Sequence, residues 1–468
     1  MIQKVLTKYW LTLHVVVLLS VTWGSTLYPS RGWCVSPLWL SLLAIQAFLL
    51  LPSMLRGETM GMARLRAWNS ALHDPFVYVG VVLIGVACIQ WLNSGCPLIY
   101  VEDMEIWRYS IPPVAWLPFS IEPFPALVML SLFVASVTGG AIFRNGTGKA
   151  GKRFFLNTAS MFSGCIAIYM VVMATLGTEP YADLSVSPNL CNWGTFFGFW
   201  LLISMGGQLN FFNARFDKTL IWSLFSLSGN LLGMLYFETP LGIALFTLVA
   251  LLMLLYFGIV LSRQLETGFS KLKLVITLFL TICVAVGVLL LTPNHPVKTK
   301  ATVLTDSSYI ETLLDVRDFR SSLAWKTWQE YPWTGVGAGG FDRYGETMIT
   351  ESDWTRLKVS GGTLSNDWLQ FLTEYGVIGI TLFVSLVVVL LIPLFARLRF
   401  VFQQSLGKAQ GDRVTSVDPY VVAGIMAILT MLLSSALLSP LQSKATFVSF
   451  VYVLSVIPGL LPVTANND

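Results

Sequence analysis

Long apolar runs separated by short polar connectors make up most of this 468-residue chain. A helix needs about 20 apolar residues to cross a bilayer, and about twelve runs approach that length. Because hydrocarbon offers no partner to backbone N–H and C=O groups, such runs cross a membrane as helices. The predicted spans cover residues 10–28, 36–55, 76–93, 124–143, 154–176, 193–212, 219–236, 241–262, 274–293, 375–396, 418–438 and 446–463.

One polar stretch interrupts this pattern before the last three spans. Residues 293–374 carry 19 of the 54 charged residues of the chain. We therefore predict an all-α polytopic membrane protein in three parts. Residues 1–292 hold spans one to nine, residues 293–374 form one large outer loop of short helices, and residues 375–468 hold spans ten to twelve with a tail.

Composition supports a membrane protein. Hydrophobic residues make up 55% of the chain, charged residues 12%, and the mean hydropathy is +0.70, whereas a soluble domain has about 25% charged residues. The first run is not followed by a small-residue cleavage site, so we expect a retained helix. The net charge of +4 gives no indication of nucleic-acid binding, and we expect no nucleic-acid partner.

The distribution of Lys and Arg predicts the orientation of the spans. With the N-terminus in the cytoplasm, the inner segments hold 18 basic residues and the short outer loops hold three, Arg31, Arg108 and Lys444. Cytoplasmic loops are enriched in Lys and Arg. Both termini are therefore predicted to be cytoplasmic, and residues 293–374 to face outward.

Cysteine use is sparse. Cys34, Cys96 and Cys191 fall in predicted outer loops. A Cys34–Cys96 bridge requires an oxidising compartment, and the sequence leaves the pairing open. The sequence has no cysteine spacing typical of a metal site.

The polar stretch holds three features in order. First, a helical run beginning at Arg317 carries two tryptophans. Second, a glycine turn covers residues 332–341; its spaced positions are Pro332, Gly335, Gly337 and Phe341. Third, residues 365–379, which we call the acid–amide segment, lead into an apolar span; its polar positions are Ser365, Asn366, Asp367, Gln370 and Glu374.

In this order, the three features resemble the membrane O-antigen ligase and polysaccharide polymerase superfamily. A large outer loop between late spans fits the same resemblance. The resemblance implies a glycosyltransferase in the bacterial inner membrane that uses an undecaprenyl-diphosphate-linked glycan. The glycan passes, at the periplasmic face, to an acceptor hydroxyl on lipid A-core of lipopolysaccharide, on a growing polysaccharide or on a protein.

Such a reaction needs positive charge beside the leaving diphosphate. Arg317 matches the motif position, and Arg320 shares its helix face. A guanidinium pairs phosphate oxygens with two donors at once, so we expect these arginines to bind the diphosphate. In the alternative, they pair with neighbouring carboxylates on a wet surface. No metal or other cofactor is expected where arginines neutralise the diphosphate.

The acceptor hydroxyl also needs a general base. The superfamily places a histidine where this chain has Ser365, and a serine hydroxyl is no base at neutral pH. Asp367 is our first candidate, because partial desolvation raises the pKa of a carboxylate toward neutrality. Glu374 and His295 are the alternatives, and Glu374 equally fits a cap at the start of the span.

Two other functions stay open. One is a non-catalytic member that binds lipid-linked glycan. This reading is consistent with a second departure: many members carry Ser-Arg-Gly two spans before the loop, and the stretch from Glu238 to Gly242 lacks arginine. The other is a multispan transporter, for which internal repeats and broken or charged mid-membrane helices are expected; we find neither.

The tryptophans of the polar stretch also fit two roles. Trp325, Trp328 and Trp333 have the apolar faces that stack on sugar rings. The same side chains suit a helix that packs onto a membrane surface.

Overall fold

The computed structural model describes most of the chain. The described residues are 2–27, 31–54, 68–101, 106–110, 112–176, 188–212, 219–264, 307–348, 366–407 and 418–461. They divide into two compact units. Unit 1 contains Met1–Thr147, Glu311–Pro393 and Ser435–Ser455, and unit 2 contains Gly148–Ile310, Leu394–Ser434 and Val456–Asp468.

Helices of the N-terminal part form the body of unit 1. They are α1 (Ile2–Leu27), α2 (Arg31–Met54), α4 (Pro75–Leu92) and α5 (Pro123–Asn145). Helix α5 packs against both α2 and α4, and α1 packs against α2. Asp74 begins α4 as its N-cap, accepting the Phe76 N–H at 3.1 Å, and Pro75 supplies a first residue that needs no donor. Helix α17 (Lys444–Val456) completes this body.

Unit 2 is built around α6 (Lys149–Thr175), α7 (Pro188–Phe212), α8 (Thr219–Phe237) and α9 (Pro240–Gln264). Helix α8 packs on both α6 and α7. Gly164 and Gly229 let the backbones of α6 and α8 approach closely. Beside them, the hydroxyls of Ser160 and Ser226 lie 2.6 Å apart, a polar contact typical of helix packing in membranes.

The all-α prediction is confirmed, with one small β-hairpin added. Four helices among the described residues are long and apolar enough to cross a membrane; they are Pro75–Leu92, Pro123–Asn145, Lys149–Thr175 and Asp367–Arg399. Shorter apolar helices accompany them. The predicted span at residues 274–293 lies outside the described residues.

The polar stretch contributes two helices to the described structure. Helix α12 (Ser307–Glu330) has 24 residues, so our expectation of short helices alone was wrong. Helix α13 (Gly340–Glu346) is a single short element. The acid–amide segment then forms the start of α15 (Asp367–Gly407).

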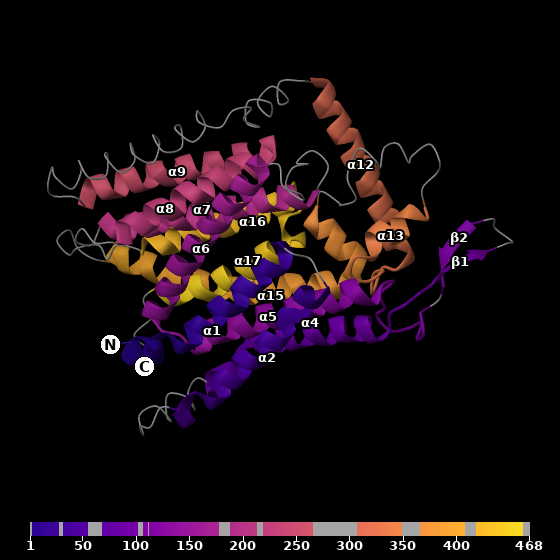
Figure 1. Ribbon diagram of the computed structural model, residues 1–468, viewed down its shortest axis with the longest axis horizontal. Coiled ribbons are helices and arrows are strands. Elements are labelled where there is room, and N and C mark those ends of the chain that lie inside the picture. The colour runs from indigo at the N-terminus through magenta and orange to yellow at the C-terminus, as the bar shows by residue number, and fades with distance from the viewer. Residues whose placement is uncertain are drawn as a thin grey trace. The chain divides into compact units, whose positions relative to one another are not determined.

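The connection after α4 contains the hairpin, where we expected a plain connector. Strand β1 (Leu98–Val101) pairs antiparallel with β2 (Ile106–Tyr109), and Leu98 lies opposite Tyr109. Figure 1 shows this hairpin projecting past the ends of α4 and α5, at the same end as α13. The polar stretch and the hairpin therefore share one end of unit 1.

The cysteine expectations need correction. Cys34 lies in α2 rather than in a loop and is buried, and its Sγ accepts a hydrogen bond from Lys444 Nζ at 2.9 Å. Cys96 is also a buried free thiol. The Cys34–Cys96 bridge is therefore not formed.

Candidate functional site

Helix α15 kinks at Gly376, and the glycine turn is hydrogen-bonded to the backbone of the kink. Gly376 has φ 64° and ψ −167°, which breaks the helical ladder. In a straight helix, the N–H groups of residues 377 and 378 would bond to the carbonyls of residues 373 and 374. Here Val377 donates to Pro332 O at 2.9 Å and Ile378 donates to Trp333 O at 3.2 Å.

The carbonyls released by the kink are satisfied by the same turn. Val336 N–H donates to Thr373 O at 3.0 Å, and Gly337 N–H donates to Glu374 O at 2.8 Å. Two lost helical hydrogen bonds are thus replaced by four bonds to the glycine turn. The two sequence features that we singled out separately are therefore one structural element.

Glycine is required at the points of closest approach. Gly335, Gly337 and Gly376 all have positive φ, a region that other residues rarely adopt. A Cβ on Gly335 would lie 2.3 Å from the Glu374 carbonyl carbon, and one on Gly376 would lie 2.3 Å from the Trp333 carbonyl carbon. Both neighbours are backbone atoms, so no side-chain rotation relieves these contacts.

The other side of the glycine turn rests on the segment after α4. A Cβ on Gly337 would lie 2.3 Å from Ser120 Cα, so only glycine fits against this segment. From α4 itself, the buried Gln90 donates through Nε2 to Thr334 O and to Glu374 O, each at 3.3 Å. Gln90 therefore binds both the turn and the kinked helix.

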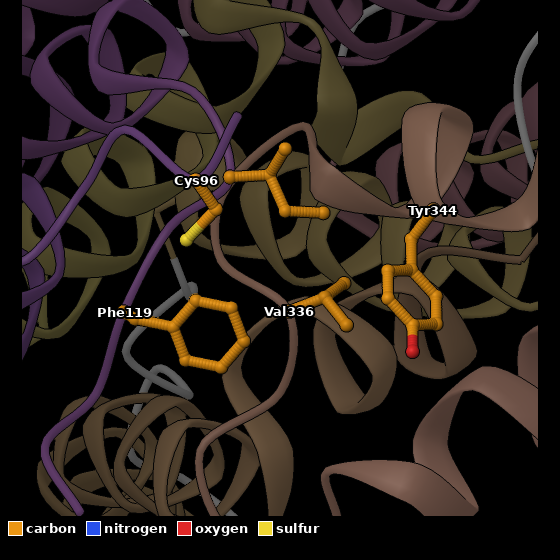
Figure 2. Packing of buried hydrophobic residues seen from close by; sticks show 5 residues of the cluster. Cys96, Phe119, Val336 and Tyr344 are labelled. Carbon is orange, nitrogen blue, oxygen red and sulfur yellow. The ribbon is translucent and has the colours of Figure 1, made fainter. Parts of the chain in front are cut away.

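A hydrophobic cluster completes this contact. It consists of Cys96, Phe119, Ile121, Val336 and Tyr344, and Figure 2 shows Val336 of the turn between the rings of Phe119 and Tyr344. Tyr344 lies on α13 and donates its hydroxyl to Glu330 at the end of α12. Burial raises the pKa of the Tyr344 hydroxyl above its ordinary value, and the bond to Glu330 raises it further. The phenol therefore stays protonated and links α13 to α12.

The first turns of α15 bind the connector between α16 (Pro419–Ser435) and α17, which we call the α16–α17 connector (residues 436–443). Asn366 caps the helix, since its Oδ1 accepts the Leu369 N–H at 3.1 Å. Asp367 is 2% exposed, and its Oδ2 accepts the Leu441 N–H at 2.8 Å. Its Oδ1 has no hydrogen-bond partner in the described part of the chain.

Gln370 and Glu374 continue the same face of α15. Gln370 accepts a hydrogen bond from the Gln442 side chain and donates through Nε2 to Glu374 Oε1 at 2.9 Å. The connector begins its turn at Ser439, whose φ of 51° is unusual for a residue other than glycine. Residues 440–442 then form the short helix η3 (Pro440–Gln442).

Arg317 reaches the same connector from α12. Its Nη2 donates to Ala436 O at 2.9 Å, using one of the five donors of the guanidinium. Arg320, one turn later, is buried with 3% of its surface exposed. Arg317 thus binds a backbone carbonyl of the α16–α17 connector.

The predicted site residues fall into two groups. Arg317, Asp367 and Gln370 meet at the connector, whereas Pro332, Gly335 and Gly337 meet α15 near the kink, further along the helix. Phe341 lies in a separate small cluster with Leu323 and Ala324. Ser365 and His295 lie outside the described residues.

Glu374 lies seven residues into α15 and two residues before the kink at Gly376, and its carboxylate accepts from Gln370. The first turn of α15 is capped by Asn366. A role of Glu374 at the start of the apolar part of α15 stays a prediction.

The sequence reasoning missed three elements of this site: Gln90, Asn93 and the α16–α17 connector. Asn93 donates to Val114 O at 2.9 Å and accepts the Val114 N–H at 2.9 Å, which fixes the path of the chain after α4. An amide side chain within or at the end of an apolar span is a detectable signal, because burial requires it to find partners.

The sequence matches no family model, and no curated protein is significantly similar to it.

Proposed function

We propose that this protein transfers a glycan from an undecaprenyl-diphosphate carrier to an acceptor hydroxyl at the outer face of a bacterial inner membrane. The observation that carries the proposal is the docking of the glycine turn on the kink of α15. The segments that resemble the glycan-transferring superfamily lie in different parts of the polar stretch, yet four backbone hydrogen bonds join them. Residues that act in one site must be held together, and these bonds hold the two segments together.

In this proposal, the arginines of α12 bind the diphosphate of the donor. During transfer, the bond between the sugar C1 and the diphosphate oxygen breaks, and negative charge gathers on the leaving diphosphate. Arg317 is half-buried and held by Ala436 O, which leaves donors of its guanidinium for phosphate oxygens. Arg320 adds a second positive charge one turn away.

In this proposal, Asp367 is the general base that takes the proton of the acceptor hydroxyl. As the new bond forms between the sugar C1 and the acceptor oxygen, the hydroxyl proton passes to a carboxylate oxygen. The Leu441 N–H holds Oδ2 in place, so Oδ1 is the oxygen that takes the proton. Asn366 and Gln370 hold the helix and the connector around this carboxylate.

A second candidate is binding of lipid-linked glycan without transfer. The burial of Asp367, at 2% exposed, favours it, because a base must reach its acceptor. The replacement of the superfamily histidine by Ser365 points the same way. The two candidates share the diphosphate site and differ only in the chemistry at Asp367.

Purified protein, lipid-linked glycan and candidate acceptors test the proposal, with product resolved on a gel. We expect Arg317→Ala to abolish transfer and Arg317→Lys to restore it only in part, because an ammonium cannot copy the guanidinium fork. We expect Asp367→Asn to abolish transfer as well. The asparagine oxygen can still accept the Leu441 N–H, so the fold is kept, and Ser365→Ala is the matched control that retains transfer.

Three outcomes decide between the candidates. Wild-type rates in Asp367→Asn would reject the base and make Glu374 and His295 the next residues to substitute. Full activity of Arg317→Ala at normal expression would reject the diphosphate site. If wild type and Ser365→His both bind the lipid-linked glycan and give no product with any acceptor, the binding function replaces the transfer function.

A further inference from the structure

The outward face of α12 carries an aromatic pair that the transfer step does not use. Exposed residues recur along this helix at intervals of four, three and four positions, which places them in one stripe. The stripe consists of Asp318, Ser322, Trp325 and Gln329, and it is bordered by the exposed Lys326 and Glu330. Trp325 is the only apolar side chain among these six residues.

Trp325 is supported from beneath by a second tryptophan. The ring centroids of Trp325 and Trp328 lie 4.7 Å apart, and Trp328 Nε1 donates to Pro332 O at 3.1 Å. Trp328 is therefore fixed to the first residue of the glycine turn. Trp325, which is 48% exposed, presents its ring on this fixed support.

A third tryptophan extends the same region. Trp333 follows Pro332 in the glycine turn, and 67% of its surface is exposed. Its backbone is not free to move, because its carbonyl accepts the Ile378 N–H at 3.2 Å. Trp333 thus directly follows Pro332, the residue to which Trp328 is bound.

The composition of the stripe argues against hydrocarbon as its partner. A helix face that lies in lipid excludes charged groups, since each is costly in hydrocarbon. Here an aspartate, a serine and a glutamine share the stripe with Trp325, and a lysine and a glutamate border it. An apolar ring beside carboxylate, hydroxyl and amide groups matches a sugar, which presents an apolar C–H face and a rim of hydroxyls.

We propose that Trp325, Trp328 and Trp333 form a platform that binds the sugar rings of the lipid-linked glycan. Trp325 and Trp333 supply the stacking faces, and Gln329 and Asp318 supply hydrogen-bonding groups along the stripe. The inference rests on the proposed function for its substrate class. It separates recognition of the glycan, by the tryptophans, from recognition of the diphosphate, by Arg317.

Binding measurements on the full-length protein in nanodiscs test the platform. The two probes are undecaprenyl diphosphate alone and the undecaprenyl-diphosphate-linked oligosaccharide extracted from the source cells. We expect wild type to bind the glycan-bearing probe more tightly, and Trp325→Ala to weaken that binding roughly tenfold without changing the affinity for undecaprenyl diphosphate. Arg317→Ala should weaken both.

Two control variants distinguish a loss of glycan binding from a loss of folding. Trp325→Phe keeps a stacking face and should keep most of the affinity. Trp116→Ala removes a tryptophan that is 80% exposed and belongs neither to the stripe nor to the glycine turn, and it should leave both affinities unchanged.

Equal affinity of wild type and Trp325→Ala for the glycan-bearing probe would overturn the platform. So would a spin label at Gln329 that is more accessible to oxygen than to a water-soluble nickel chelate, because the stripe would then lie in lipid. Neither result would reject the binding of the diphosphate by Arg317. If wild type binds neither probe, the proposed function itself fails.

Discussion

Replacing Gly376 by alanine should detach the glycine turn from α15. The φ and ψ of this residue lie in a region that is essentially restricted to glycine, and another residue costs about 1–3 kcal/mol there. The new Cβ would also lie 2.3 Å from the Trp333 carbonyl carbon, so the turn must move away. Loss of the four backbone bonds removes about 1 kcal/mol each, and straightening of α15 restores two helical bonds, so the net loss is about 2 kcal/mol.

Thermal unfolding in detergent, followed with a thiol-reactive dye, measures this effect. Cys34 and Cys96 are buried free thiols of unit 1, so they react only as that unit opens. A loss of this size corresponds to a Tm lower by roughly 4–8 °C. Gly335→Ala, whose Cβ would meet the Glu374 backbone, should behave in the same way.

The matched control is Gly85→Ala in α4. A Cβ at Gly85 meets nothing within 4 Å, and alanine is the better helix former by about 1 kcal/mol. Its Tm should therefore equal or slightly exceed that of wild type. A Gly376→Ala protein that inserts normally and unfolds within 1 °C of wild type would refute the strain and docking argument.

Two further predictions concern orientation and charge pairing. A cysteine at Ser307, in a cysteine-free background, should react with an impermeant thiol reagent in whole cells or spheroplasts, because the polar stretch is predicted to face outward; labelling only after lysis would reject that topology. Asp74→Ala should lower the Tm well beyond Arg153→Ala, since Asp74 is buried against Arg144, and an unpaired buried charge costs about 3–5 kcal/mol. The pair of Arg153 with Asp418 leaves Arg153 49% exposed, and such pairs are worth about 1 kcal/mol or less; equal losses in the two variants would contradict this ranking.

Hydropathy predicted the helices well because each apolar run carries its own signal. The ranges 76–93 and 124–143 fall within two residues of α4 and α5. The hairpin β1–β2 escaped notice, because four-residue strands in a mixed polar and aromatic segment give no clear alternation. The motif residues were identified, but their contacts were not.

Those contacts are made largely by the backbone, which explains the limit. The bonds of Val336 and Gly337 to α15 involve N–H and C=O groups that every residue has, so side-chain chemistry gives no trace of them. Only the glycines, which the contacts require to have positive φ, can be recognised in the sequence. The bond of Asp367 to the Leu441 N–H joins residues that lie 74 positions apart, and no spacing rule relates them.

The kink also has a consequence for the assembly of the protein during its synthesis. Val377 and Ile378 can pair with residues 373 and 374 in an unbroken helix, so a newly made α15 can insert straight with its ladder complete. The glycine turn is synthesised before α15 and is already present when the helix emerges. Docking exchanges one satisfied set of hydrogen bonds for another. On this reasoning, the bend forms only when the turn and the helix have met.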